Sequence, residues 1–251
     1  MTQAVTQIMI EATEIGMTLG AGAARVDALK GVNLSLAGGE LTLLMGPSGS
    51  GKTTLLSVLG CMLSPTSGSV RIRGRSTSGL DPEQLAQVRR ENVGFVFQSY
   101  HLFQTLTAAE NVRLALDVRG DRSPLVRAKA DAALATVGLS HKANAFPRSL
   151  SGGEQQRVAV ARAIVGDASV ILADEPTAAL DSENGAVVMT VLAKMAENPA
   201  RALFVVTHDP RIIPFSDRIL HIEDGRVVSD QRRDRRNGSI LTLKYASGGA
   251  A

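Results

Sequence analysis

The feature that most constrains the fold of this chain is a glycine-rich segment, GPSGSGKTT, at residues 46–54. The apolar run Leu41 to Met45 precedes it directly, and an apolar stretch with helical character begins at Leu55. Strand, glycine loop and helix in this order are typical of a P-loop, in which backbone N–H groups and the positive end of a helix dipole surround a phosphate. The sequence therefore predicts a nucleotide-binding α/β domain.

Each residue type in this loop has a physical role. Glycines allow the tight curl that points several N–H groups at one anion. Lys52 is expected to bridge the β- and γ-phosphates of the nucleotide, and Thr53 to offer its hydroxyl to magnesium. The residues expected to bind nucleotide here are Gly46, Pro47, Ser48, Gly49, Ser50, Gly51, Lys52, Thr53 and Thr54. The loop alone does not distinguish a kinase, a GTPase and a transport ATPase.

Short apolar runs elsewhere predict the rest of a parallel sheet. Three of them, Val93 to Phe97, Val170 to Ala173 and Leu203 to Val206, are nearly continuous rather than alternating. Strands that are covered on both faces have this pattern. An apolar pattern from Ala28 to Leu36 and a turn at Gly38-Gly39 indicate one more strand before the strand of the phosphate loop.

The segment at about residues 99–165 has helical character. Thr107 with Glu110, and Ser151 with Glu154, form capping boxes that each predict the start of a helix. We therefore expect a helical subdomain inserted into the sheet.

The C-terminal part is expected to end in a short hairpin. Arg218 to Ile222 and Arg226 to Val228 flank Glu223-Asp224-Gly225, which is a turn signal. From about Ser229 the sequence has no convincing periodicity. We expect a single domain over residues 1–228 and a solvated tail over residues 229–251, whose arginines include Arg232.

Two carboxylates and a histidine are candidates for catalysis. Asp174 and Glu175 end the apolar run at 170–173, and His208 closes the run at 203–206. Nucleotides bind at the carboxyl edge of parallel sheets. Asp174 is placed to reach magnesium, whereas Glu175, as its neighbour, points elsewhere and is expected to orient and polarise an attacking water. A hydrogen bond from His208 to the γ-phosphate is feasible from the same edge.

The most discriminating segment is LSGGEQQRVAVARA at residues 150–163. It occurs in order with the P-loop, Gln98, Asp174-Glu175, Asp181 and His208. From about Met9 to Val228 the chain resembles the ATP-hydrolysing subunit of an ABC transporter. The resemblance implies a P-loop NTPase (RecA-like) core with a parallel sheet, an antiparallel β subdomain and the inserted α-helical subdomain, with ATP and Mg²⁺ bound.

The resemblance also implies a dimer. Ser151, Gly152 and Gly153 place a hydroxyl and bare N–H groups at a helix start, which forms an anion site. In the family this segment closes over the nucleotide held by the P-loop of a second subunit, so two ATP molecules are sandwiched between two copies. Asp181 then lies on the dimer seam. Gln98 contacts the magnesium and water region, and its loop senses a membrane partner.

The expected partners are a second copy of the chain and a separate transmembrane permease, with no direct binding of nucleic acid. No stretch approaches about 18 consecutive apolar residues, so the expected location is the cytoplasmic face of the membrane, peripheral through the permease. The single cysteine, Cys61, is expected to be a buried apolar residue. The segment after Gln98, Ser99 to Phe103, is aromatic-rich and is expected to dock the permease.

Within the family, the wording GFVFQSYHLFQTLTAAENV and LADEPTAALD most resembles the ATPases of macrolide export, lipoprotein release and glycolipid export. The leading hypothesis is therefore export. Importers and the cell-division ATPase share much of this wording and remain alternatives. A soluble ABC ATPase of nucleic-acid repair or translation is a further alternative, but those relatives generally add a coiled coil, zinc-binding cysteines or a second ATPase copy. A P-loop kinase would leave LSGGEQQ unexplained.

One position departs from the family pattern. Relatives carry a tyrosine upstream of the P-loop that stacks on adenine, whereas the aligned stretch here, LGAGAARVDAL, has Leu19 at that position. No aromatic residue occurs before Phe95. We expect weaker binding of ATP, and weaker discrimination between adenine and guanine, than in relatives with the ring.

Overall fold

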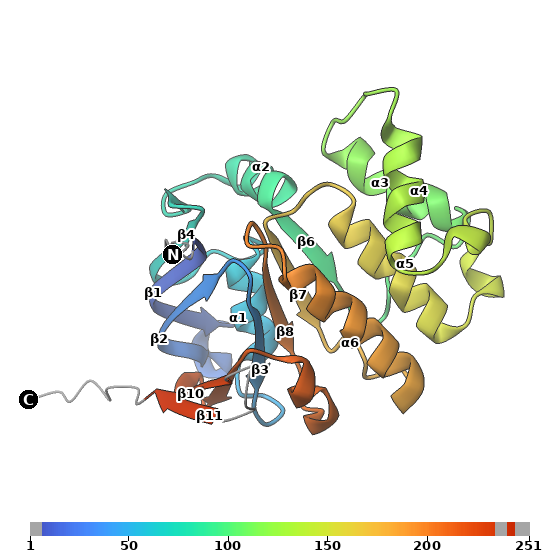
Figure 1. The fold of residues 1–251 in the computed structure, drawn as a ribbon. Helices are drawn as coiled ribbons and strands as arrows, with labels where there is room; N and C mark the ends of the chain where they lie inside the picture. The colour runs from blue at the N-terminus through green and yellow to red at the C-terminus, as the bar shows by residue number, and fades with distance from the viewer. Residues whose placement is uncertain (1–6, 234–239, 244–251) are drawn as a thin grey trace, which may run out of the picture.

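The computed structural model describes residues 7–233 and 240–243, and a seven-stranded sheet forms its centre (Figure 1). The strand order is β11-β10-β9-β3-β8-β7-β6, and β9, β3, β8, β7 and β6 run parallel. The parallel strands are β3 (Leu41–Met45), β6 (Val93–Val96), β7 (Val170–Asp174), β8 (Ala202–Val206) and β9 (Arg218–Glu223). The parallel sheet predicted from the continuous apolar runs is therefore confirmed.

The sheet is buried on both faces because its strands carry apolar side chains in both directions. Leu43 belongs to one hydrophobic core and Leu44, the next residue, to the other. The first core contains α5 (Gly152–Ile164) and α6 (Ser182–Ala196), and the second contains α1 (Lys52–Leu59). The two cores therefore pack helices against opposite faces of the parallel sheet.

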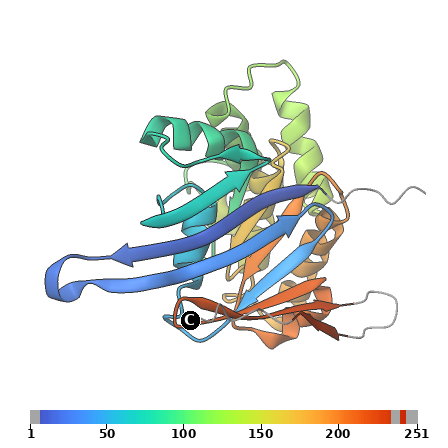
Figure 2. The same cartoon turned by 90° about the vertical axis from the view of Figure 1, so that its left-hand side faces the viewer.

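A second, antiparallel sheet covers the outer side of α1. Its order is β2-β1-β4-β5, with β1 (Ile8–Leu19), β2 (Val26–Ala37), β4 (Ser67–Ile72) and β5 (Arg75–Ser76). Figure 2 shows β1 and β2 as a long two-stranded arm beside the parallel strands. The expected strand before the phosphate loop is β2, but it joins a different sheet from β3, and β1 has no counterpart among the strands expected from the sequence.

Three helices between β6 and β7 form a separate group, at the right of Figure 1. They are α3 (Ala108–Val118), α4 (Val126–Thr136) and α5. Thr107 and Ser151 cap α3 and α5 in the capping boxes expected from the sequence, with Glu110 and Glu154 as reciprocal partners. The remaining helices are α2 (Pro82–Asn92) and the short 3-10 helices η1 (Gly22–Ala24), η2 (Ser140–Lys142), η3 (Pro147–Ser149) and η4 (Pro210–Phe215).

The C-terminal strands differ from the expected tail. β10 runs over Arg226–Arg233 and pairs with β11 (Ile240–Leu243), so the expected boundary at Val228 lies inside a strand. Arg232, expected in a solvated tail, lies 3.5 Å from the Glu40 carboxylate. Residues 234–239 and 244–251 of that tail lie outside the described residues.

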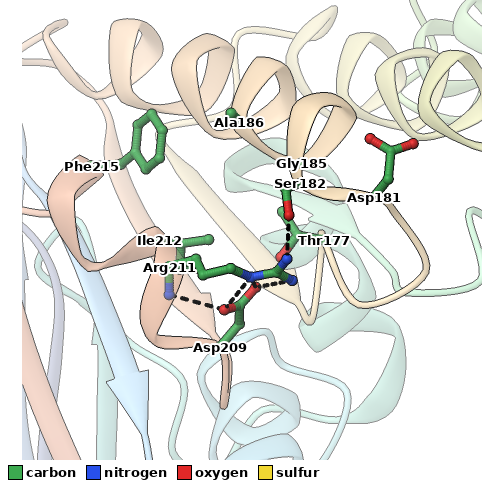
Figure 3. Close-up of a pocket in the computed structure, with 9 residues that line it drawn as sticks. All are labelled: Thr177, Asp181, Ser182, Gly185, Ala186, Asp209, Arg211, Ile212 and Phe215. Carbon is green, nitrogen blue, oxygen red and sulfur yellow. Dashed lines mark hydrogen bonds and ion pairs between the residues drawn. The ribbon is translucent and has the colours of Figure 1, made fainter.

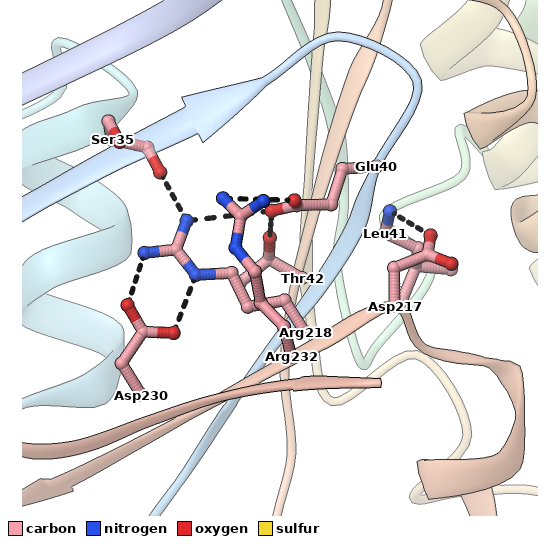
Figure 4. Close-up of polar contacts among 8 residues, drawn as sticks. All are labelled: Ser35, Glu40, Leu41, Thr42, Asp217, Arg218, Asp230 and Arg232. Atoms are coloured by element: carbon pink, nitrogen blue, oxygen red, sulfur yellow. Dashed lines mark hydrogen bonds and ion pairs between the residues drawn. The ribbon is translucent and has the colours of Figure 1, made fainter. Parts of the chain in front are cut away.

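Strand pairing extends this far because a buried ion pair joins β9 to β10 (Figure 4). The Arg218 guanidinium donates to both oxygens of Asp230, at 2.7 and 2.6 Å, and to the backbone oxygen of Ser35 in β2 at 2.6 Å. Arg218 is 4% exposed and Asp230 5% exposed. A charged pair in a polar sequence stretch has no apolar periodicity, which is why the sequence pattern did not indicate this strand.

Candidate functional site

The phosphate loop connects β3 to α1, and its glycines are required by space and by backbone conformation. A Cβ atom on Gly46 would lie 2.1 Å from the backbone oxygen of Ile222 in β9. Gly51, which directly precedes α1, has a φ of 101°, in the region that glycine adopts without strain. Buried Leu55 and Leu56 anchor the first turns of α1, so the helix N-terminus stays aimed at the loop.

Lys52, the first residue of α1, curls back over the loop. Its Nζ donates to the backbone oxygens of Gly46 at 2.8 Å and Pro47 at 2.7 Å. The ammonium is therefore held inside the curve of the loop, where an anion on the loop N–H groups meets a positive charge.

The next residue, Thr53, meets Asp174 at the end of β7. Burial raises the pKa of the Asp174 carboxyl above its usual value, and a hydrogen bond with Thr53 opposes this effect without cancelling it. A hydroxyl and a carboxylate are the oxygen ligands that Mg²⁺ accepts, and Mg²⁺ commonly keeps several waters beside one or two protein ligands. The pair fits a magnesium ion that is shared with a bound phosphate, and no group of three acidic, histidine or cysteine side chains suited to a metal occurs among the described residues.

Glu175 leaves the line of β7 by a turn of the backbone. Its φ is 47°, and its N–H donates to the Val206 oxygen of β8 at 2.9 Å. The Oε1 atom lies 2.7 Å from Nδ1 of His208, whereas Oε2 is buried without a hydrogen-bond partner within the described part of the chain. His208 thus holds one oxygen of the carboxylate, and the other is available to accept from a small donor such as water.

A cavity of about 520 Å³ is lined by Lys52, Thr53, Asp174 and Glu175. His208 contacts Glu175 but is not one of the residues that line this cavity. This volume lies in the range of small-ligand sites. Its walls come from the phosphate loop, the ends of β7 and β8, the β1–β2 arm and the β9–β10 turn. The lining residues are Leu19, Val26, Asp27, Ala28, Lys30, Ser48, Gly49, Gly51, Lys52, Thr53, Thr54, Asp174, Glu175, Val206, Asp224 and Gly225.

The structure places Leu19 at this cavity. Leu19 pairs with Val26 across the β1–β2 arm, and both side chains are partly exposed to the cavity they line. An aliphatic pair therefore stands on the wall that continues from the phosphate loop. The wall offers apolar contact to a flat ring but no aromatic face.

The β9–β10 turn also supports the loop, which the sequence did not indicate. The Gly225 N–H donates to the Ser50 oxygen at 3.1 Å, and the Gly225 oxygen accepts from the Lys30 N–H at 2.9 Å. The EDG turn signal was visible in the sequence, but a turn signal does not say which distant segment the turn will contact.

Several other predicted residues do not line this cavity. Gln98 is exposed just after β6. Ser151 caps α5, with Oγ accepting from the Glu154 N–H at 3.2 Å, and Gly152 and Gly153 begin that helix. None of these lines the cavity of its own chain. The start of α5, which the sequence predicted to bind an anion, therefore lies outside the site that the phosphate loop forms.

Asp181 caps α6 near that helix start. Its carboxylate accepts from the Asn184 N–H at 2.9 Å and from the Asn184 side chain at 2.7 Å. A Cβ atom on Gly153 would lie 2.4 Å from the Asn184 oxygen, so the starts of α5 and α6 are in close contact. Asp181, like Ser151, does not line the cavity.

The segment after Gln98 forms part of a groove of about 360 Å³. Tyr100 and His101 both have positive φ, at 60° and 49°, and Arg162 of α5 donates to both of their backbone oxygens. Phe103 is 55% exposed at the groove and Phe97 lines it. Arg162 was not among the residues expected from the sequence, because an arginine inside a helix has no local signal for the loop that it holds.

The expectation for Cys61 is confirmed, since the side chain is buried in the second core. Burial raises the pKa of its thiol to about 11. Among the described residues no helix is long and apolar enough to cross a membrane.

The chain is similar in sequence to known proteins. The family model described as ABC transporter matches residues 29–178. The chain is 44% identical over 226 residues to the macrolide export ATP-binding/permease protein MacB 1 of Aeromonas hydrophila, which covers 90% of this chain and 35% of that protein. It is 42% identical over 233 residues to MacB of Salmonella typhimurium, covering 92% and 36%. The chain thus spans about a third of the length of these curated relatives.

Solved structures give the same result. A dimeric post-hydrolysis structure of an ATP-binding cassette bound to ADP and Pi is 42% identical, with a TM-score of 0.82 and coverage of 89% of this chain and 98% of that one. The structure of cbiO1 from Clostridium perfringens, part of the ABC transporter complex cbiONQ, is 27% identical, with a TM-score of 0.79 and coverage of 89% and 88%.

Proposed function

The chain belongs to the ABC transporter family, and we propose that its ATPase cycle, carried out by a dimer, powers export through a membrane permease. It is an ATP-binding cassette of an ATPase family, as the sequence resemblance predicted. The observation that carries the catalytic part is the Glu175–His208 contact beside the phosphate loop. The proposed location is the cytoplasmic face of the membrane, through contact with the permease.

Binding of ATP begins at the phosphate loop. The loop N–H groups and the α1 N-terminus accept the phosphates, and Lys52 turns from the Gly46 and Pro47 oxygens toward the β- and γ-phosphates. Thr53 and Asp174 would hold Mg²⁺, and Gln98 is proposed, from the family resemblance, to contact the magnesium and water region. When bound, Mg²⁺ supplies positive charge that stabilises the charge developing on the phosphates.

The role of activating the attacking water is assigned to Glu175. Its Oε1 is held by His208 at 2.7 Å, so Oε2 is the oxygen that orients and polarises the water. His208 is the side chain that contacts both this carboxylate and, by our proposal, the γ-phosphate. Because phosphoryl transfer depends mainly on positioning and charge stabilisation, a fixed carboxylate orientation contributes directly to the rate.

The proposed dimer is supported by the residues that lie outside the cavity. Ser151, Gly152 and Gly153 form an anion site on α5 that their own chain does not use. The γ-phosphate of the ATP bound by a second copy would occupy this anion site, and Asp181 would then lie at the dimer interface. The dimeric cassette at 42% identity supports this arrangement.

The permease is proposed to dock in the groove around Phe97 and Phe103. Exposed aromatic side chains are enriched at protein interfaces. Export is favoured over the other transporter types by the identity of 42–44% to macrolide export proteins, whose names include a permease. Nothing in the site favours nucleic acid as a partner.

The catalytic proposal is tested with purified protein by ATP turnover and by light scattering after size-exclusion chromatography. Lys52→Ala is expected to abolish turnover. Glu175→Gln is expected to keep ATP bound and to accumulate dimer. Turnover of Glu175→Gln at the parent rate would show that another group activates the water.

The docking proposal is tested by co-expression with a candidate membrane permease. Phe103→Ser is expected to reduce the amount of permease that co-purifies. Leu125→Ser is the matched control, since Leu125 is 60% exposed and lies outside the groove. Equal recovery with both variants contradicts docking in the groove.

A further inference from the structure

A small cavity separates the loop after β8 from the start of α6, and one arginine bridges it (Figure 3). The cavity holds about 50 Å³ and is lined on its polar side by Thr177, Asp181, Ser182, Asp209 and Arg211. Arg211 has no role in the family motifs described above. It lies three residues after His208, and Ser182 lies one residue after Asp181.

Arg211 forms a multiple contact with Asp209. Its Nε lies 2.9 and 3.0 Å from the two carboxylate oxygens, and its Nη2 lies 2.8 Å from Oδ2. The Asp209 side chain is 14% exposed, and the Arg211 hydrogen bond is the main cause of the lowered pKa of its carboxyl. The backbone of Arg211 also donates to Asp209 Oδ1 at 2.9 Å.

Asp209 in turn is fixed beside the catalytic histidine. Its N–H donates to Oγ1 of Thr207 at 3.0 Å, and Thr207 is fully buried. The backbone on both sides of His208 is therefore held, on one side by the core and on the other by the Asp209–Arg211 contact. His208 reaches Glu175 from this fixed segment.

The Nη1 nitrogen of Arg211 reaches the start of α6, at the proposed dimer interface. Nη1 donates to Oγ of Ser182 at 2.6 Å, at the first turn of α6 whose cap is Asp181. A single guanidinium thus connects the start of α6 with the segment that carries His208. The planar fork of arginine can serve both partners at once, which a lysine ammonium cannot do with the same geometry.

We propose that Arg211 is a positioning residue, which transmits the position of the seam turn at Asp181-Ser182 to His208 through Asp209. The inference rests on the proposed function, because the seam is occupied only in the dimer. When the partner shifts α6, the Arg211 arm shifts Asp209 and with it the histidine on the Glu175 carboxylate. Hydrolysis then depends on the partner being seated, whereas ATP binding in the main cavity does not.

The first test is steady-state ATP turnover of four variants. Arg211→Ala and Ser182→Ala are each expected to lower kcat roughly five- to tenfold, as the loss of one charge-assisted hydrogen bond at a partly exposed site implies. The KM for ATP is expected to stay within about twofold. The double variant is expected to lose no more than either single variant, because both remove the same link. Ser182→Thr keeps the hydroxyl and is expected to retain the parent kcat.

The second readout needs no nucleotide. Amide hydrogen exchange in residues 208–215 is expected to rise about threefold or more in Arg211→Ala and in Ser182→Ala. The fold is expected to persist, because Ile212 is buried and packs η4 into the first core. Arg122→Ala is the control, since Arg122 pairs with Asp117 at 3.2 Å on the exposed surface far along the chain.

The outcomes separate the two proposals. If the parent protein hydrolyses ATP and both Arg211→Ala and Ser182→Ala turn over ATP at the parent rate, the inference about Arg211 is overturned and the ATPase proposal stays intact. Independent losses that multiply in the double variant overturn it too. A parent protein that hydrolyses no ATP overturns the proposed function, and the positioning role with it.

Discussion

Removal of the Arg218 side chain is expected to destabilise the whole domain, although Arg218 does not line the cavity at the phosphate loop. In the folded protein its guanidinium contacts both oxygens of Asp230, the backbone oxygen of Ser35 and, at 3.5 Å, the Glu40 carboxylate. Arg218→Ala leaves Asp230 buried, at 5% exposed, without either donor. It also leaves the Ser35 oxygen without this partner.

The expected loss is about 3–5 kcal/mol, the cost of removing one partner from a buried ion pair. For a domain of this size, each kcal/mol lowers the midpoint of thermal unfolding by about 2–4 °C, so a fall of roughly 6–20 °C is expected. The penalty arises mainly from the unpaired carboxylate. The double variant Arg218→Met with Asp230→Leu removes both charges and is therefore expected to recover most of the loss.

The assay is urea unfolding at pH 7, followed by circular dichroism, on the parent, the single variant and the double variant. Arg122→Ala serves as the matched control, because its pair with Asp117 is exposed and is expected to contribute less than about 1 kcal/mol. A loss below about 1 kcal/mol for Arg218→Ala would refute the reasoning. A double variant as unstable as the single one would show that packing, rather than the unpaired charge, sets the cost.

Three further predictions concern the site and the core. Gly46→Ala is expected to abolish ATP binding, since its Cβ would lie 2.1 Å from the Ile222 oxygen and the loop must move; calorimetric titration with parent-like affinity would contradict this. Leu19→Tyr, in the Glu175→Gln background, is expected to tighten ATP binding about fivefold, from about 1 kcal/mol of base–aromatic stacking, and to favour ATP over GTP. Equal affinities for both nucleotides in both versions would contradict it. The Cys61 thiol has its pKa raised from 9.0 to about 11, so the unfolded chain ionises first as the pH rises. The stability contribution of the neutral Cys61 thiol is therefore complete below about pH 9 and is lost between about pH 9 and 11. The urea midpoint of Cys61→Ala is expected to rise relative to that of the parent as the pH increases from 8 to 10.5. A difference in urea midpoint that stays constant over this range would contradict the prediction.

The parts of the fold that were predictable are those whose signals are local. The apolar runs at 93–97, 170–173 and 203–206 contain buried parallel strands, because a short and continuous apolar run is typical of a strand covered on both faces. The capping boxes at Thr107 and Ser151 work in the same way, since both hydrogen bonds form within four residues.

The parts that were not predictable depend on contacts between distant segments. β10 was expected to end at Val228, but it continues to Arg233, because Asp230 finds Arg218 on the neighbouring strand and the pair is buried. β1 carries a mixed pattern with polar residues at alternate and irregular positions, and it becomes a strand through pairing with both β2 and β4. Neither partner can be read from the strand itself.

The sequence by itself determined which chemical groups this protein carries: a loop for phosphate, a carboxylate pair, a histidine and a second glycine-containing helix start, each encoded by residue types within a short segment. Only the tertiary structure decided how these groups meet. It brought His208 to one oxygen of Glu175 and left the other oxygen without a hydrogen-bond partner among the described residues. It also placed Leu19 on the cavity wall and kept Ser151 outside the cavity of its own chain. It also joined Arg211 to Ser182 across 29 residues. These distances depend on how two cores pack against one sheet, and packing is a property of the whole chain rather than of any segment.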